Sequence, residues 1–170
     1  ELAGEIATAL GLDPITARVL VARGLDTVTA AEGFLAPGLD ELHSPFAFVQ
    51  MEPAVERLLY ALRNGELIAV HGDYDVDGIT GAVLLVTVLR HLGGEVELIL
   101  PHRIDDGYGL NPGGVDKAHA AGAAVLVAVD CGITALEACA HARSRGIDVI
   151  VADHHLPRPE LPPAIALLNP

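Results

Sequence analysis

The sequence predicts an α/β fold in which a mostly parallel β-sheet is flanked by helices and preceded by a small helical N-terminal segment. From residue 66 onward, short continuous apolar runs alternate with segments of helical apolar spacing. This alternation is typical of parallel strands that are covered on both faces. Before residue 50, the apolar spacing is helical and is broken at Pro14, Gly24 and Pro37. We therefore expect a helical segment over residues 1–50 and a sheet domain over residues 51–170.

The N-terminal segment contains three short stretches in which apolar residues recur on one helical face. We expect helices at Leu2–Leu10, Thr16–Arg23 and Thr29–Leu35. The stretch Leu39–Val49 is expected to be a loop. An amphipathic helix is then expected over Pro53–Asn64, and Gly65 ends it.

Strands and helices alternate through the rest of the chain. The expected strands are Leu67–Val70, Val96–Leu100, Val125–Val129, Val149–Ala152 and Ile165–Leu168. The expected helices are Gly81–Leu92, Gly114–Ala121 and Ala135–Arg145. A glycine follows each of these three helices, which is a common way for a helix to end.

The composition is that of a globular protein. Of the 170 residues, 51% are hydrophobic and 19% are charged, which is enough for one substantial core. No apolar run reaches the length of about eighteen residues that a membrane-spanning helix needs, and no secretion signal is visible. Cys131 and Cys139 form no CxxC pair, so we expect neither a disulfide framework nor a structural zinc site. A reducing cytoplasm fits this composition best.

Acidic and histidine residues follow the expected strands. The first strand runs into the segment 71–78, which contains Asp73, Asp75 and Asp77, and in which Gly72 and Gly78 would allow sharp turns. The later strands run into Pro101-His102-Arg103, Asp130-Cys131-Gly132 and Asp153-His154-His155. Ligand sites of parallel α/β sheets form beyond the carboxyl ends of the strands. We therefore expect one crevice to collect these side chains.

Divalent cations are the simplest way to stabilise such a crowd of carboxylates, because neighbouring carboxylates cannot all ionise cheaply. A single aspartate at a strand end is usually a helix cap or a turn residue, but three alternating acids with further strand-end acids are poorly explained in that way. Mixed oxygen and imidazole ligands suit Mn²⁺ better than Ca²⁺, with Mg²⁺ as a substitute. Two ions roughly 3.5–4 Å apart would clamp a phosphate and activate a water for in-line attack.

Four more side chains are candidates for this chemistry. His71 lies four residues before Asp75, which favours a ligand role over simple packing. His155 is expected to contact the substrate or take part in catalysis, and the alternative is that it faces solvent. Arg103 can hold a phosphate through two hydrogen bonds, or it forms a surface salt bridge. Tyr108 can stack on a base or bind a phosphate oxygen, or it only packs its loop.

The formal net charge of −13 argues against broad non-specific DNA wrapping, because affinity for phosphates normally comes from Lys and Arg. Two interpretations stay open. Either the protein does not contact nucleic acid, or its acids hold cations that meet phosphate while the basic surface lies elsewhere. The chain has no G-x-G-x-x-G loop after the first strand and no G-x-x-x-x-G-K-[ST] loop, so the common nucleotide-binding folds fit poorly.

Several motifs resemble those of one known family. Asp153-His154-His155 is similar to the signature of the DHH phosphoesterases. The segment 71–78 (HGDYDVDG), Arg103 with the GYGL of residues 107–110, and Asp130-Cys131-Gly132 resemble the other motifs in the RecJ branch of that family. The N-terminal Arg23-Gly24 and Phe34-Leu35 are also similar to that branch. The resemblance covers essentially the whole chain.

The resemblance implies a single-strand-specific 5′-to-3′ DNA exonuclease of repair and recombination that uses Mn²⁺ or Mg²⁺ and works beside a helicase and a single-strand-binding protein. By motif position, four residues resemble the metal ligands of the family: Asp75, Asp77, Asp130 and His154. Asp130 would bridge the two ions. His71 matches a ligand histidine of pyrophosphatase relatives, and Asp73 is an additional acid of the RecJ motif. His155 would contact the scissile phosphate or protonate the leaving oxygen, and Arg103 and Tyr108 would hold the nucleotide.

The chain departs from the family in one respect. DHH enzymes use a further aspartate downstream of the tripeptide and a second domain that closes over the site, whereas this chain stops at Asn169-Pro170. We therefore expect it to be a fragment of the catalytic part. Two other functions are possible for such a chain: a DHH enzyme for short oligonucleotides, cyclic dinucleotides or pyrophosphate, and an inactive replisome scaffold. Scaffold relatives lose the metal acids, which this chain keeps.

Overall fold

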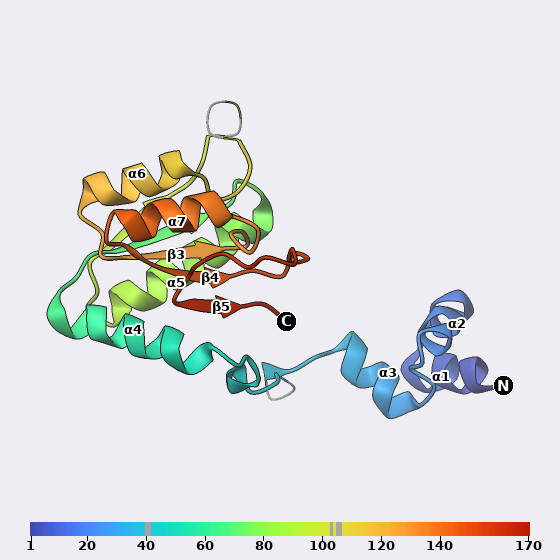
Figure 1. Ribbon diagram of the computed structural model, residues 1–170. Helices are drawn as coiled ribbons and strands as arrows, with labels where there is room; N and C mark the ends of the chain where they lie inside the picture. The colour runs from blue at the N-terminus through green and yellow to red at the C-terminus, as the bar shows by residue number, and fades with distance from the viewer. Residues whose placement is uncertain (40–41, 103, 105–106) are drawn as a thin grey trace. The chain divides into compact units, whose positions relative to one another are not determined.

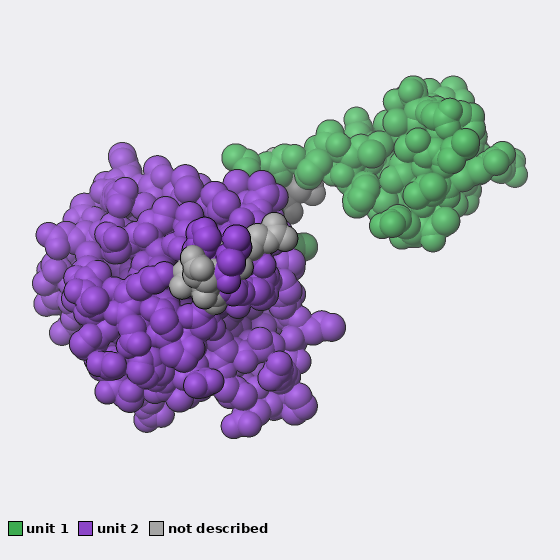
Figure 2. All heavy atoms as spheres, turned by 90° about the horizontal axis from the view of Figure 1, so that it is seen from above, with its two compact units in different colours: residues 1–44 green, residues 45–170 purple. Residues whose placement is uncertain are grey.

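The computed structural model describes residues 1–39, 42–102, 104 and 107–170 (Figure 1). Arg103, one of the expected nucleotide-binding residues, lies outside the described residues. The chain divides into two compact units, Glu1–Ser44 and Pro45–Pro170 (Figure 2). Each unit has a hydrophobic core of its own. None of the helices in the described ranges is long and apolar enough to cross a membrane.

The first unit is a group of three short helices. They are α1 (Leu2–Leu10), α2 (Pro14–Ala22) and α3 (Val28–Leu35). Helix α2 begins two residues before the expected Thr16, because the carboxylate of Asp13 accepts a hydrogen bond from the backbone N–H of Ile15 at 2.8 Å and Pro14 suits the first helical position. The buried centre of the unit consists of Ile6, Ala17, Leu20 and Ala31.

The second unit is built on a five-stranded sheet with the order β2-β1-β3-β4-β5. All four strand pairings are parallel, as the sequence predicted. The strands are β1 (Ile68–Gly72), β2 (Val96–Ile99), β3 (Val125–Val129), β4 (Asp148–Ala152) and β5 (Ala166–Leu168). In the register of the central strands, Ile68 pairs with Val125, and Val125 pairs in turn with Asp148.

Helices cover both faces of the sheet (Figure 1). Helices α6 (Pro112–Ala121) and α7 (Leu136–Ser144) pack on one face, and α4 (Met51–Asn64) and α5 (Val76–His91) pack on the other. A short 3₁₀ turn, η2 (Pro45–Ala47), precedes α4 within the expected loop. In β3, Leu126 packs under α6 and α7 while Val127 packs under α4 and α5. Burial on both faces explains why the strands are apolar at consecutive positions.

The segment that follows β1 differs from its expected form. Strand β1 extends to Gly72 and includes His71, and α5 begins at Val76 rather than at Gly81. The helix begins early because the Asp75 side chain caps it, accepting a hydrogen bond from the Gly78 N–H at 3.0 Å. Only residues 73–75 therefore connect strand and helix.

The two glycines beside this turn serve close packing rather than the sharp turning that the sequence suggested. A Cβ on Gly72 would lie 2.6 Å from the carbonyl oxygen of Gly78, and a Cβ on Gly78 would lie 2.5 Å from the backbone nitrogen of Asp73. Neither glycine has a positive φ. The first turn of α5 therefore touches the end of β1 backbone to backbone.

Candidate metal centre

The candidate site lies at the carboxyl ends of β1, β3 and β4, which are neighbours in the sheet. The chain runs from β1 through α5 to β2 on one side, and from β3 through α7 to β4 on the other. Strand order reverses between β1 and β3, so the connections there lead away in opposite directions. Such a switch point is the usual ligand site of open parallel sheets.

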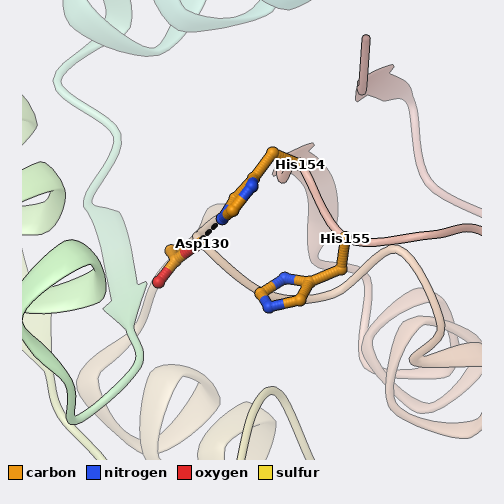
Figure 3. Close-up of side chains that lie close together, drawn as sticks. All are labelled: Asp130, His154 and His155. Carbon is orange, nitrogen blue, oxygen red and sulfur yellow. Dashed lines mark ion pairs between the residues drawn. The ribbon is translucent and has the colours of Figure 1, made fainter. Parts of the chain in front are cut away.

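Three of the expected site residues meet at this edge. Asp130, His154 and His155 each offer one ligand atom, and these atoms lie within 4.8 Å of one another (Figure 3). His154 Nε2 lies 3.0 Å from Asp130 Oδ1, and the two side chains point toward each other. The His154 and His155 rings lie side by side, with centroids 4.7 Å apart. The structure therefore brings together one carboxylate and two imidazoles from neighbouring strand ends.

Asp130 is buried and lies near further negative charge. Burial, and next the charge of Asp75, raise the pKa of the Asp130 carboxyl above its usual value, and Asp77 adds a smaller contribution of the same sign. The nearby His154 and His155 act in the opposite direction without cancelling the rise. The negative charges around Asp130 thus disfavour its charged form, and a bound cation would offset this effect.

The backbone at Asp130 turns sharply. Asp130 has a φ of 59°, in the left-handed region, and Gly132 has a φ of 108°. A Cβ on Gly132 would lie 3.0 Å from the Cβ of Ala128 and 3.3 Å from a methyl of Val151, so the turn lies directly on the sheet. An aspartate tolerates the left-handed region better than most residues, and only glycine suits the conformation at position 132. This turn directs the Asp130 carboxylate toward His154.

Asp73 is fully buried, and one of its oxygens lacks a protein partner among the described residues. Its Oδ1 accepts a long hydrogen bond of 3.4 Å from the Gly109 N–H, while its Oδ2 has no hydrogen-bond partner in the part of the chain that the structure describes. Leaving a buried carboxylate oxygen unpaired is costly. A bound divalent cation would supply the missing interaction, so the residues present fit the metal that the sequence predicted.

His71 lies in a different setting from the other expected ligands. Its ring is buried within β1, against the start of α6, where a Cβ on Gly114 would come within 2.8 Å of His71 Nε2. Its Nδ1 lies 3.9 Å from Cys131 Sγ. The group of Asp130, His154 and His155 does not include it. The glycine at position 114 thus allows helix α6 to lie over the imidazole.

Both carboxylate oxygens of Asp153 accept hydrogen bonds from the protein. Its Oδ1 accepts hydrogen bonds from the N–H groups of His154 at 2.8 Å and His155 at 3.1 Å, and from His155 Nδ1 at 2.7 Å. Its Oδ2 accepts from the Ile133 N–H at 3.0 Å. Burial by itself would raise the pKa of Asp153, but the hydrogen bonds from Ile133 and His155 outweigh it and hold this pKa below its usual value. Asp153 therefore ties the turn after β4 to the turn after β3.

His155 stands between Asp153 and Tyr108. Because a carboxylate only accepts, Nδ1 carries the proton in the contact with Asp153, and Nε2 faces the Tyr108 hydroxyl at 3.0 Å. The hydrogen bond with Asp153 raises the pKa of His155. Burial, followed by the charges of Asp73, Asp130 and Asp153, raises the pKa of Tyr108 to about 12. Tyr108 is therefore a neutral hydroxyl that can donate to His155 or to a ligand.

The sequence reasoning gave no specific role to two contributors to the site. Asp153 was counted among the strand-end acids without a role of its own, whereas in the structure it accepts hydrogen bonds from the backbone of two turns. A strand-end aspartate is also a common turn residue. The other is Asn169, whose side-chain Nδ2 donates to the carbonyl oxygens of Asp153 at 2.8 Å and His155 at 3.0 Å. Asn169 follows the last expected strand, but its partners could not be predicted, because they depend on the pairing of β4 with β5.

The comparison with known families agrees with this geometry. The profile of the DHH family, N-terminal domain, matches residues 67–170. The chain belongs to the DHH family. The matched region begins just before β1 and contains every residue of the candidate site. The family resemblance that the motifs predicted is thereby confirmed.

The curated relatives of the chain include RecJ exonucleases. The single-stranded-DNA-specific exonuclease RecJ of Escherichia coli (strain K12) is 50% identical over 121 residues, which are 71% of this chain and 21% of that protein. RecJ of Bacillus subtilis (strain 168) is 35% identical over 161 residues, 95% of this chain and 20% of that protein. The chain thus spans about a fifth of the length of these curated relatives.

Solved structures of RecJ share the fold. RecJ of Thermus thermophilus in complex with Mn²⁺ aligns with a TM-score of 0.72 at 31% identity, over 99% of this chain and 23% of that chain. A second structure, of an exonuclease RecJ bound to manganese, aligns with a TM-score of 0.69 at 37% identity, over 76% of this chain and 33% of that chain. The expected α/β fold of the DHH type is therefore confirmed.

Proposed function

We propose that this chain forms the catalytic N-terminal part of a single-strand-specific 5′-to-3′ DNA exonuclease that hydrolyses phosphodiester bonds with two Mn²⁺ or Mg²⁺ ions. The observation that carries the proposal is the group of Asp130, His154 and His155, gathered at the strand ends of a DHH-family sheet beside the acids that follow β1. The relatives that share this region are named as single-stranded-DNA-specific exonucleases.

The ions would be held by the side chains that the motifs single out: Asp73, Asp75, Asp77, Asp130, His154 and His71. Bound divalent cations neutralise phosphate charge and lower the pKa of a coordinated water, which supplies the nucleophile. Asp130 would help to hold both ions, because His154 Nε2 lies 3.0 Å from its Oδ1 and the charges of Asp75 and Asp77 also act on it. The proposed ligand role of His71 rests only on its place in the motif, because His71 is not in the group of Asp130, His154 and His155.

His155 is proposed to contact the scissile phosphate and to protonate the leaving oxygen. Its raised pKa keeps the imidazolium form available at higher pH than for a free histidine. Asp153 holds the Nδ1–H, so the other nitrogen, Nε2, is the one that can reach a substrate. Tyr108 and Arg103, from the loop after β2, are proposed to hold the nucleotide, and Tyr108 already contacts His155 Nε2 at 3.0 Å.

We propose that the full activity is that of a longer protein, since this chain spans about a fifth of the length of its curated relatives. We propose residues 51–170 as part of its catalytic domain and residues 1–50 as a helical lead. A further metal-binding aspartate and a closing domain would lie outside this chain. Action in DNA repair and recombination, in the cytoplasm and beside a helicase and a single-strand-binding protein, is part of the same proposal.

The test is cleavage of single-stranded DNA labelled at the 5′ end or the 3′ end by the intact protein, with Mn²⁺ and with a chelator. We expect release of mononucleotides from the 5′ end, loss of activity with the chelator, and no activity in the Asp130→Ala variant. Turnover of dinucleotides or pyrophosphate without cleavage of long DNA would keep the metal centre and reassign the substrate. Inactivity on all substrates would favour a scaffold.

A further inference from the structure

The turn that carries the two histidines is held through its backbone, in addition to the side-chain contacts of His154 with Asp130 and of His155 with Asp153 and Tyr108. The side chains of His154 and His155 are 62% and 44% exposed, so packing does little to fix them. The backbone N–H groups of both residues are bound by the buried carboxylate of Asp153. Their placement therefore also depends on what holds the backbone of the turn from the opposite side.

The side chain of Asn169 binds the turn from this opposite side. Its Nδ2 donates to the carbonyl oxygen of Asp153 at 2.8 Å and to the carbonyl oxygen of His155 at 3.0 Å. Both partners are acceptors, so the side chain can meet them only through its NH₂ group. The two carbonyls belong to the residues on either side of His154, and one amide group thus spans the residue whose imidazole faces Asp130.

Strand pairing puts Asn169 in this position. In the β4–β5 ladder, Ala152 pairs with Leu168, and the Asp153 N–H continues the ladder by donating to the Leu168 carbonyl at 3.0 Å. The next residue on β4 enters the histidine turn, and the next residue on β5 is Asn169. A shift of one residue in this register would turn the amide to the other face of the sheet.

We propose that Asn169 is a positioning residue, which fixes the backbone on both sides of His154 so that its Nε2 meets Asp130 before any ion binds. This inference rests on the proposed function, in which His154 is a metal ligand. Removing the partners that orient metal ligands typically lowers affinity by about 10- to 100-fold. We expect an effect of that size when the amide of Asn169 is lost.

The experiment compares Asn169→Ala and Asn169→Leu with the unaltered chain. Leu keeps the branched shape of Asn, at a larger volume, and has no donor, whereas Ala leaves a gap. A loss that both variants share is therefore due to the missing hydrogen bonds rather than to packing. Asn64→Ala is the matched control, because Asn64 Nδ2 also donates to a backbone carbonyl, that of Tyr60 at 2.8 Å at the end of α4. Mn²⁺ affinity is measured by calorimetry, and the imidazole ¹⁵N signals of His154 and His155 are recorded by NMR without metal.

We expect both Asn169 variants to bind Mn²⁺ about 10- to 100-fold more weakly, with shifted or broadened His154 signals in the metal-free protein, while Asn64→Ala changes neither. Unchanged affinity and unchanged imidazole signals in the Asn169 variants would overturn the positioning role. His154→Ala is measured alongside them. If it binds Mn²⁺ normally, the proposed ligand is wrong, and the metal-free imidazole signals still decide whether Asn169 positions the turn.

Discussion

Asp130 combines a left-handed backbone, burial and two acidic neighbours in one residue. Each property is unfavourable for a folded chain without metal. Its pKa is raised by burial and by Asp75, which means that the folded state binds a proton at this carboxyl more readily than the unfolded state does. Stability is therefore lost as the pH rises from the unfolded pKa, about 3.9, through the folded pKa. The surroundings of Asp130 therefore favour binding of a cation at the expense of the stability of the metal-free protein.

Replacing Asp130 by Asn should separate stability from metal binding. We expect Asp130→Asn to raise the free energy of unfolding of the metal-free protein at pH 7 by about 0.5–1 kcal/mol, because the unfavourable charge is removed. The same variant should lose most of its Mn²⁺ affinity. All three tyrosines lie in the second unit, so near-ultraviolet tyrosine signals follow the unfolding of that unit.

Asp130→Ala is the control for the backbone. It removes the same charge but lacks the short polar side chain that eases the left-handed conformation, so it should be about 1 kcal/mol less stable than Asp130→Asn. A metal-free Asp130→Asn protein that is clearly less stable than the unaltered chain would mean that the ion pair with His154 outweighs the repulsion from Asp75 and Asp77.

Residue types at strand ends were enough to predict that Asp130, His154 and His155 gather, but not how each side chain is used. The grouping of Asp130 with His154 and His155 followed from the rule that parallel strands end at one edge. The role of Asp153 as a backbone acceptor could not be read, because an aspartate that binds metal and one that caps a turn look alike in sequence. Asn169 was given no role because its partners are set by strand register.

At the scale of the elements, the close contact between the end of β1 and the first turn of α5 fixes the position of the acidic segment. The chain leaves the sheet at Gly72, turns over residues 73–75 and enters the helix with Asp75 as its cap. A Cβ on Gly78 would lie 2.5 Å from the nitrogen and 2.7 Å from the carbonyl oxygen of Asp73. Backbone atoms cannot yield as a side chain can, so this contact fixes where Asp73 sits.

Gly78→Ala should therefore destabilise the second unit by about 3 kcal/mol or prevent its folding, as expected for a methyl group forced into occupied space. Gly81→Ala is the matched control in the same helix. Its Cβ would meet only a methyl of Val129, at 2.9 Å, and the gain in helix propensity offsets part of that contact. Equal effects of the two substitutions in chemical denaturation would contradict the backbone contact as the cause.

Element boundaries were predicted well where apolar pattern alone decides them. Strand β3 begins and ends as expected, at Val125 and Val129. Helix α5 begins five residues before the expected Gly81, because the pattern of acids and glycines looked like a loop. Asp75 is at once a helix cap and a candidate ligand, and sequence reasoning assigned it only the second role.

At the scale of the whole molecule, the net charge of −13 means that Mn²⁺ could stabilise the protein either by screening charge or by binding at the acidic edge of the sheet. Any salt stabilises a strongly acidic protein by screening repulsion, so a stabilising effect of Mn²⁺ is not by itself evidence of a site. A specific site differs from screening in two ways. It saturates at low concentration, and it depends on particular carboxylates rather than on net charge.

We therefore expect Mn²⁺ to stabilise the second unit by about 2.7 kcal/mol when the free ion is at one hundred times its dissociation constant. Sodium chloride at equal ionic strength should give only a small part of this gain. Asp130→Asn should abolish the specific part, whereas Asp116→Asn, which removes an exposed carboxylate paired with His141 on the surface, should leave it intact. If both variants keep the Mn²⁺ effect, or if sodium chloride reproduces it, the ion acts on overall charge and the metal centre is not at Asp130.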